Sequence, residues 1–153
     1  MNACKGLKQK QQKMASINTY LNFNGNTEEA FNFYKSVFGG EFITVQRFKD
    51  APGCEGMKAD DQEKLMHIAL PVGGGILMGT DITDPMPAAT YGTGISLSLD
   101  AESEEEAKQL FDGLSAGGKA TMPLEKMFWN ALFGMLTDKF GIQWMINYDY
   151  NKK

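Results

Sequence analysis

The pattern of apolar and polar positions in the first half of the chain predicts one strand, one helix and three further strands. Apolar and polar residues alternate in INTYLNF (residues 17–23), as in a strand covered on one face. In NTEEAFNFYKSVFGG (residues 26–40) the apolar residues recur at helical spacing after Asn26, a plausible N-cap, and a glycine pair ends the segment. Strands are then predicted in EFITVQRF, KLMHIAL and GILMGTD, and the last two form a hairpin.

The same order recurs after the proline-rich linker ITDPMPAAT. A strand in GISLSLD (residues 94–100) precedes a helix in SEEEAKQLFDGLSAGG, where Ser103 and Glu106 have the form of a capping box. A strand near KATMPLE and two strand-like runs within MFWNALFGMLTDKFGIQWMIN complete this half. We interpret the chain as an internal duplication with α+β structure: modules 16–82 and 92–150 form a single domain, 16–150, after a polar tail, 1–15.

Composition narrows the class of protein. A chain of 153 residues has room for one substantial core, and it contains no apolar run of the roughly 20 residues that a membrane helix requires. The net charge is −4 and the lysines cluster only in the tail, so we expect no nucleic-acid partner. The tail lacks the features of a secretion signal, and it either frays or ties down on a second subunit. Two cysteines allow at most one bridge, so we expect reduced thiols and a cytoplasmic protein.

Several segments together resemble a known superfamily. They are AFNFYKSVFGG (residues 30–40), HIAL, ILMGTD, MPLEKMFW and LTDKFGIQWMI, within roughly residues 17–148. They resemble the PhnB-like branch of the glyoxalase/bleomycin resistance/dihydroxybiphenyl dioxygenase (vicinal oxygen chelate) superfamily, a branch also labelled 3-demethylubiquinone-9 3-methyltransferase-like. The resemblance implies two βαβββ modules that form a curved mixed sheet with a cleft, and it implies a homodimer. The chain has FWNALFG and DKFG where the branch usually has FWGDRYG and DPFG, so ligand contacts there would differ.

The metal ligands of the superfamily are missing from the matching positions. Its metalloenzymes place His or Glu on the first and last strand of each module, which here correspond to Asn18, Met78, Gly94 and Met145. Divalent ions need carboxylate, imidazole or thiolate ligands, and a shift of one residue supplies none, so we expect no metal and no cofactor. The methyltransferase label is disfavoured as well, because the glycines of VGGGILMGTD lead into a strand and not into a helix.

The residues expected in the cleft favour binding over chemistry. Strand alternation places a polar, uncharged and Met-containing set on the side of the ligand positions. The opposite face, including Trp144 and Ile95, should pack beneath the helices. Such a cleft suits a neutral or aromatic small molecule. The predicted ligand-binding residues are Asn18, Tyr20, Asn22, His67, Met78, Ser96, Ser98, Trp129, Gln143 and Met145.

The alternative is a metal-independent enzyme that acts on a small metabolite. His67 is the only histidine, and either His67 or Tyr20 is the candidate acid/base. A histidine that only satisfies structural hydrogen bonds would fit the same position on KLMHIAL. Trp129 would line the cleft or its entrance. Whether the chain is an enzyme stays open at this point.

Overall fold

The structure is a computed structural model that describes residues 15–152. The predicted tail, apart from Ala15, lies outside the described residues. The first module contains a strand, a helix and three strands, with two short helices before the last two strands. Its elements are β1 (Thr19–Phe23), α1 (Thr27–Phe38), β2 (Thr44–Arg47), η1 (Phe48–Asp50), α2 (Ala59–Gln62), β3 (Leu65–Val72) and β4 (Gly75–Asp81).

The second module repeats this order without the short helices. Its elements are β5 (Leu97–Asp100), α3 (Glu104–Ser115), β6 (Lys119–Lys126), β7 (Ala131–Thr137) and β8 (Gln143–Asp149). Most segments with a predicted periodicity form the predicted element, but several strands are shorter than their patterns. The run 41–48 keeps four strand residues, and the run 94–100 becomes a strand only at Leu97.

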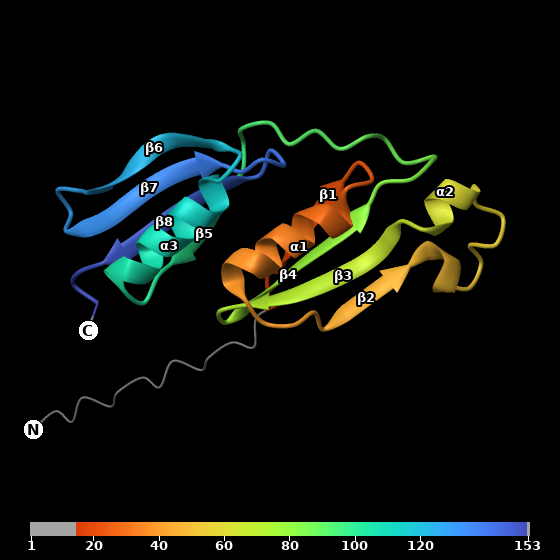
Figure 1. Cartoon of the computed structure of the whole chain (residues 1–153), viewed down its shortest axis with the longest axis horizontal. Coiled ribbons are helices and arrows are strands. Elements are labelled where there is room, and N and C mark those ends of the chain that lie inside the picture. The colour runs from red at the N-terminus through yellow and green to blue at the C-terminus, as the bar shows by residue number, and fades with distance from the viewer. Residues whose placement is uncertain (1–14, 153) are drawn as a thin grey trace, which may run out of the picture.

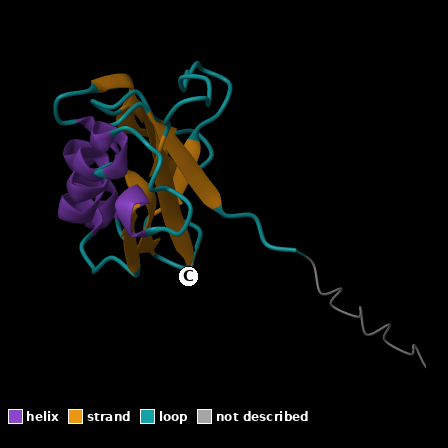
Figure 2. Cartoon of the chain, turned by 90° about the vertical axis from the view of Figure 1, so that its right-hand side faces the viewer, coloured by secondary structure: helices purple, strands orange, loops and turns teal. Residues whose placement is uncertain are grey.

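Each module forms its own four-stranded mixed sheet. The strand orders are β1-β4-β3-β2 and β5-β8-β7-β6, and the first strand of each module runs parallel to the last. The other neighbours are antiparallel. The two sheets lie side by side, and helices α1 and α3 cover the same side of them (Figure 1, Figure 2). We call the side away from these helices the open face. No described helix is long and apolar enough to cross a membrane.

The core lies between the helices and the sheets, and a glycine lets each helix approach closely. A Cβ at Gly79 of β4 would stand 2.6 Å from the ring of Phe31 on α1, and one at Gly134 of β7 would stand 2.8 Å from the ring of Phe111 on α3. Trp144 is 2% exposed, which confirms its predicted place in the core. The same prediction for Ile95 is wrong: its side chain is 78% exposed, because β5 begins only at Leu97.

The two long helices begin in different ways. The capping box of α3 is confirmed in its main contact, since the Glu106 backbone N–H donates to Ser103 Oγ at 3.0 Å. Asn26 precedes α1 but its side chain makes no capping hydrogen bond to a described residue. Instead the carboxylate of Asp81, at the end of β4, accepts hydrogen bonds from the backbone N–H and the hydroxyl of Thr27 at 3.0 and 2.6 Å.

Candidate functional site

A cavity of about 640 Å³ lies between the two modules, and we call it the linker cavity. Strand β1, the connecting residues 82–92 and the residues around the start of β8 line it. Of the described residues that line it, none carries a charge. The lining combines hydrogen-bonding groups with apolar surface, and its polar members include Asn18, Tyr20, Asn22, Tyr91 and Gln143.

The connecting segment that walls this cavity is fixed to β1 and to the β7–β8 turn. The Asn24 side chain accepts a hydrogen bond from Ala89 N at 2.7 Å and donates one to Ala89 O at 3.0 Å. The ring of Tyr91 lies 6.0 Å from that of Phe23, and a Cβ at Gly141 would stand 2.9 Å from it. Burial raises the pKa of Tyr91, and the nearby carboxylates of Asp138 and Asp81 raise it further. Tyr91 is thus a packed part of the cavity wall.

The part of the wall formed by residues 141–143 depends on the buried carboxylate of Asp138, which sequence reasoning did not assign to the site. Asp138 accepts hydrogen bonds from the backbone N–H groups of Phe140 and Ile142 at 2.8 and 3.0 Å. It also accepts one from Trp144 Nε1 at 2.9 Å and one from the Tyr34 hydroxyl at 2.7 Å. Because Tyr34 belongs to α1, this carboxylate joins the β7–β8 turn to the first module. The signal in the sequence was the Asp of DKFG.

The environment of Tyr34 follows from this contact. Its side chain is fully buried. Burial is the main cause that raises the pKa of its hydroxyl far above the ordinary value, and the negative charge of Asp138 adds to the shift. The hydroxyl therefore stays protonated and remains a donor to Asp138.

Tyr20 and His67 meet on the open face of the first sheet. The Tyr20 hydroxyl lies 2.9 Å from His67 Nδ1, and the two rings stack with centroids 5.6 Å apart. Burial raises the pKa of Tyr20, while a hydrogen bond with Thr80 opposes the shift. A protonated Tyr20 can donate to Nδ1 only while that nitrogen carries no proton. The structure therefore brings together the two residues that were each a candidate acid/base in the sequence.

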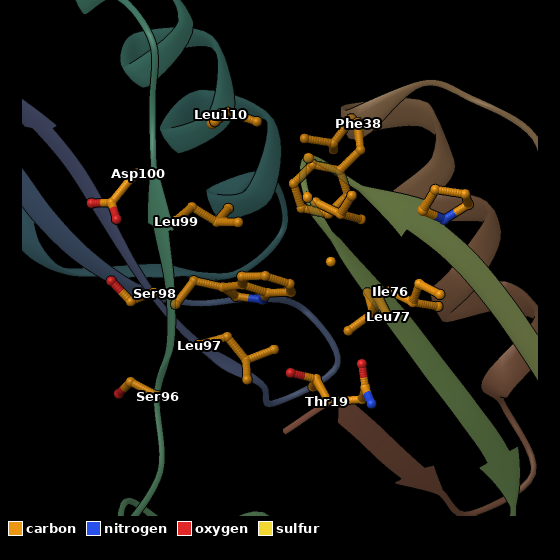
Figure 3. A pocket seen from close by; sticks show the side chains of 18 of the residues that line it. Thr19, Phe38, Ile76, Leu77, Ser96, Leu97, Ser98, Leu99, Asp100 and Leu110 are labelled. Carbon is orange, nitrogen blue, oxygen red and sulfur yellow. The ribbon is translucent and has the colours of Figure 1, made fainter. Parts of the chain in front are cut away.

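Another cavity, of about 740 Å³, opens nearer the helices, and we call it the helix-side groove. The hairpin between β3 and β4, the end of α1, strand β5 and α3 line it. Figure 3 shows Leu97 and Leu99 of β5 pointing toward Phe38 and Leu77, whereas Ser98 and its neighbours of equal parity point away. The β5 wall of this groove is therefore apolar, but the whole lining is mixed, because Asp100, Glu106 and Gln109 also belong to it.

The ten residues predicted to bind a ligand do not share one cavity. Asn18, Tyr20, Asn22 and Gln143 line the linker cavity, and Asn18 with Ser96 and Ser98 lines the helix-side groove. His67 and Met78 lie on the first sheet beside Tyr20, and Met145 lies on the second sheet. Trp129 lies in the turn before β7, 47% exposed and in contact with Phe128 and Phe133. Ligand binding by any of them stays a prediction.

The described residues offer no site for a divalent metal ion of the usual kind. Within residues 15–152, no three His, Cys, Asp or Glu side chains come close enough to hold one. The positions that correspond to the superfamily ligands carry Asn18, Met78, Gly94 and Met145.

A family model and several solved structures match this chain over most of its length. A family described as 3-demethylubiquinone-9 3-methyltransferase matches residues 15–147. The structure of protein PA1353 from Pseudomonas aeruginosa is similar at 41% identity and a TM-score of 0.78, covering 89% of this chain and 98% of that one. A putative 3-demethylubiquinone-9 3-methyltransferase, PhnB protein, from Bacillus cereus is 30% identical with a TM-score of 0.69, covering 88% and 99%.

A more distant structure identifies the fold. A glyoxalase-related enzyme from Fulvimarina pelagi has a TM-score of 0.60 at 16% identity, covering 88% of this chain and 89% of that one. At this identity the likeness concerns the fold alone. Two βαβββ modules with four-stranded mixed sheets are the glyoxalase/bleomycin resistance fold, as the sequence predicted.

Proposed function

The chain belongs to the PhnB-like, or 3-demethylubiquinone-9 3-methyltransferase, family, and from that premise we propose that it binds a neutral or aromatic small molecule between its modules, without the metal ligands of the superfamily. The observation that carries this proposal is the uncharged lining of the linker cavity. Its volume of about 640 Å³ falls within the range of small-molecule sites.

The chemistry of the lining favours a neutral ligand over an ion. Burying a charged group without a counter-charge is costly, and the described residues around this cavity supply none. Amide groups of Asn18 and Gln143 and the hydroxyl of Tyr20 can orient polar substituents of a ligand. The side chains of Tyr91, Met86 and Ile95 supply apolar surface for a ring.

Matched aromatic probes test this proposal. We expect 1-naphthol to bind more tightly than 1-naphthoate or 1-naphthylmethylamine, measured by ligand-observed NMR and calorimetry on the full chain. Tyr20→Phe, which removes a hydroxyl from the linker cavity, should weaken 1-naphthol binding. Ser98→Ala is the matched control, because Ser98 lines the helix-side groove but not the linker cavity. Equal binding of the charged probes, or a loss on Ser98→Ala alone, would contradict the proposal.

A metal-independent enzyme is the second candidate, and the 2.9 Å contact between Tyr20 and His67 favours it. His67→Gln separates the two functions. A binding protein tolerates this change, whereas an acid/base enzyme loses turnover and keeps its ligand. Elemental analysis, with thermal-shift titration of Ni, Zn, Mn and Fe(II), tests the proposed lack of a divalent metal. A stoichiometric divalent metal would restore lyase or dioxygenase chemistry to consideration.

We also propose a cytoplasmic homodimer. The dimer is expected from the family resemblance, and large exposed apolar side chains support it: Ile17 is 101%, Phe128 96% and Ile95 78% exposed. Light scattering should give twice the mass of one chain, and a monomer at micromolar concentration would contradict the proposal. Cytoplasmic location is proposed from the two cysteines, which allow at most one bridge.

A further inference from the structure

Three methionines form a row across the second sheet. Met145 of β8 is the direct partner of Met135 on β7, and Met135 is the partner of Met122 on β6. The comparable row in the first sheet carries a single thioether, since it runs Tyr20, Met78, Ala69 and Thr44. The row of Met122, Met135 and Met145 is here called the thioether row.

The thioether row lies on the open face. Leu136, Trp144 and Ile146 alternate with Met135 and Met145 along their strands and are buried beneath α3 at 1%, 2% and 0% exposure. Because side chains alternate between the faces of a strand, Met135 and Met145 point the other way. Met122 lies on the edge strand β6, between two register shifts, and its direct pairing with Met135 places it on the same face.

The spacing of the row suits one shared ion. Opposed residues of neighbouring antiparallel strands have Cβ atoms about 5 Å apart. A methionine side chain has three rotatable bonds, so three sulfur atoms on adjacent strands can converge on a single point. Thioethers are neutral, soft donors that select Cu(I) over the divalent ions of the superfamily.

Charges on the neighbouring row favour a cation. That row runs Asp100, Asn147, Phe133 and Glu125, and it places a carboxylate at each end. On the other side of the thioether row the partners are Gln143, Thr137 and Lys119, so that row has one cation, on the same edge strand as Met122, against two carboxylates in the row of Asp100 and Glu125. We propose that Met122, Met135 and Met145 bind one soft monovalent cation, Cu(I) or its redox-inert analogue Ag(I).

The proposed cation site is separate from the ligand proposed above. Of the residues that line the linker cavity and the helix-side groove, none belongs to the thioether row. Loss of cation binding and loss of 1-naphthol binding are therefore independent outcomes, and each is measured on the same variants.

Silver titration tests the site directly. The full chain with Cys4→Ser and Cys54→Ser is used, because thiolates would bind Ag(I) more tightly than thioethers. Calorimetry in chloride-free buffer should give one Ag(I) per chain, and anaerobic competition with bicinchoninate should show Cu(I) binding. Zn(II) should not bind. Met135→Leu should weaken Ag(I) binding about tenfold or more.

Two controls keep the result specific. Leucine conserves the volume of methionine, so Met135→Leu should unfold at nearly the same temperature as its parent and still bind 1-naphthol. Met78→Leu removes a thioether from the first sheet and should leave Ag(I) binding unchanged. The proposal is overturned if the cysteine-free chain binds no Ag(I), or if Met135→Leu binds it as tightly as its parent. The row would then be an adaptable apolar surface.

Discussion

Two buried carboxylates, Asp81 and Asp138, both accept hydrogen bonds from buried donors, but Asp81 does so within one module and Asp138 across both. Each is 3% exposed, and each accepts several hydrogen bonds. The partners of Asp81 are the backbone N–H and hydroxyl of Thr27 and the Leu65 backbone N–H, all in the first module. Asp138 instead joins its own turn and Trp144 to Tyr34 of the other module.

Asp81 therefore stabilises the fold of one module, whereas Asp138 stabilises the contact between the two modules. A buried carboxylate is tolerated where donors satisfy its oxygens, and removing it leaves those donors unpaired. Loss of Asp81 should therefore act within one sheet and its helix, while loss of Asp138 should act on the wall of the linker cavity and on the contact between modules.

Asp138→Ala is expected to have the largest effect. It leaves two backbone N–H groups, the Trp144 indole and the Tyr34 hydroxyl without their acceptor, at a cost of about 4 kcal/mol in the free energy of unfolding. Urea unfolding measures the loss, and hydrogen exchange should rise in residues 139–143. Asp138→Asn keeps one carbonyl acceptor and should lose less. Equal stability of the alanine variant and its parent would remove the assigned role of Asp138.

Asp81→Ala should cost somewhat less, about 3 kcal/mol, because three donors lose their acceptor. Faster hydrogen exchange should appear at Thr27 and Leu65, the start of α1 and of β3, and should spare the β7–β8 turn. If exchange instead rises equally in both modules, the two carboxylates do not divide their roles as proposed.

Tyr34→Phe removes one of the four donors to Asp138 and should cost about 1.5 kcal/mol at neutral pH. The pKa of Tyr34 is raised in the folded chain, so above its ordinary value of 10.0 the unfolded tyrosine loses a proton that the folded one keeps. Stability should therefore fall as the pH rises above that value, and less steeply in Tyr34→Phe. Urea unfolding at several pH values compares the slopes. Parallel slopes would show that Tyr34 is not the group responsible.

The helix caps should give the smallest effects. Ser103→Ala removes the capping hydrogen bond of α3 and should cost about 1 kcal/mol. Asn26→Ala should cost less than about 0.5 kcal/mol, because Asp81 holds the first turn of α1. Thermal unfolding of the two variants makes the comparison, and a larger loss for Asn26→Ala would reverse it.

Local periodicity was enough to predict the order of the elements, because each helix and most strands bury one face. It could not predict that Ile95 stays exposed, since the start of a strand depends on where pairing with β8 begins. Strand alternation placed Tyr20 and His67 among the cleft residues, but their contact depends on the order of β1 and β3 in the sheet and was not predicted. The role of Asp138 did not, because its partner Tyr34 lies 104 residues away.

Reliance on strand alternation also explains why the sequence predicted one cleft, whereas the predicted residues divide between two cavities and the sheet surfaces. Alternation assigns a face to Asn18 or Met145, but the distance between two sheets depends on the packing of α1 and α3 and on the connecting residues 82–92. That segment was predicted as a linker, and its role as a wall of a cavity became visible only in three dimensions.

The close packing of the Tyr91 ring on Gly141 restricts which residues can occupy position 141. A Cβ at position 141 would stand 2.9 Å from the ring, and the backbone there has φ +92°, which favours glycine. Relatives with a larger residue at this position must route the segment between their modules differently. Residue 141 can therefore serve as a marker for sorting family members into those that share this cavity wall and those that have remodelled it.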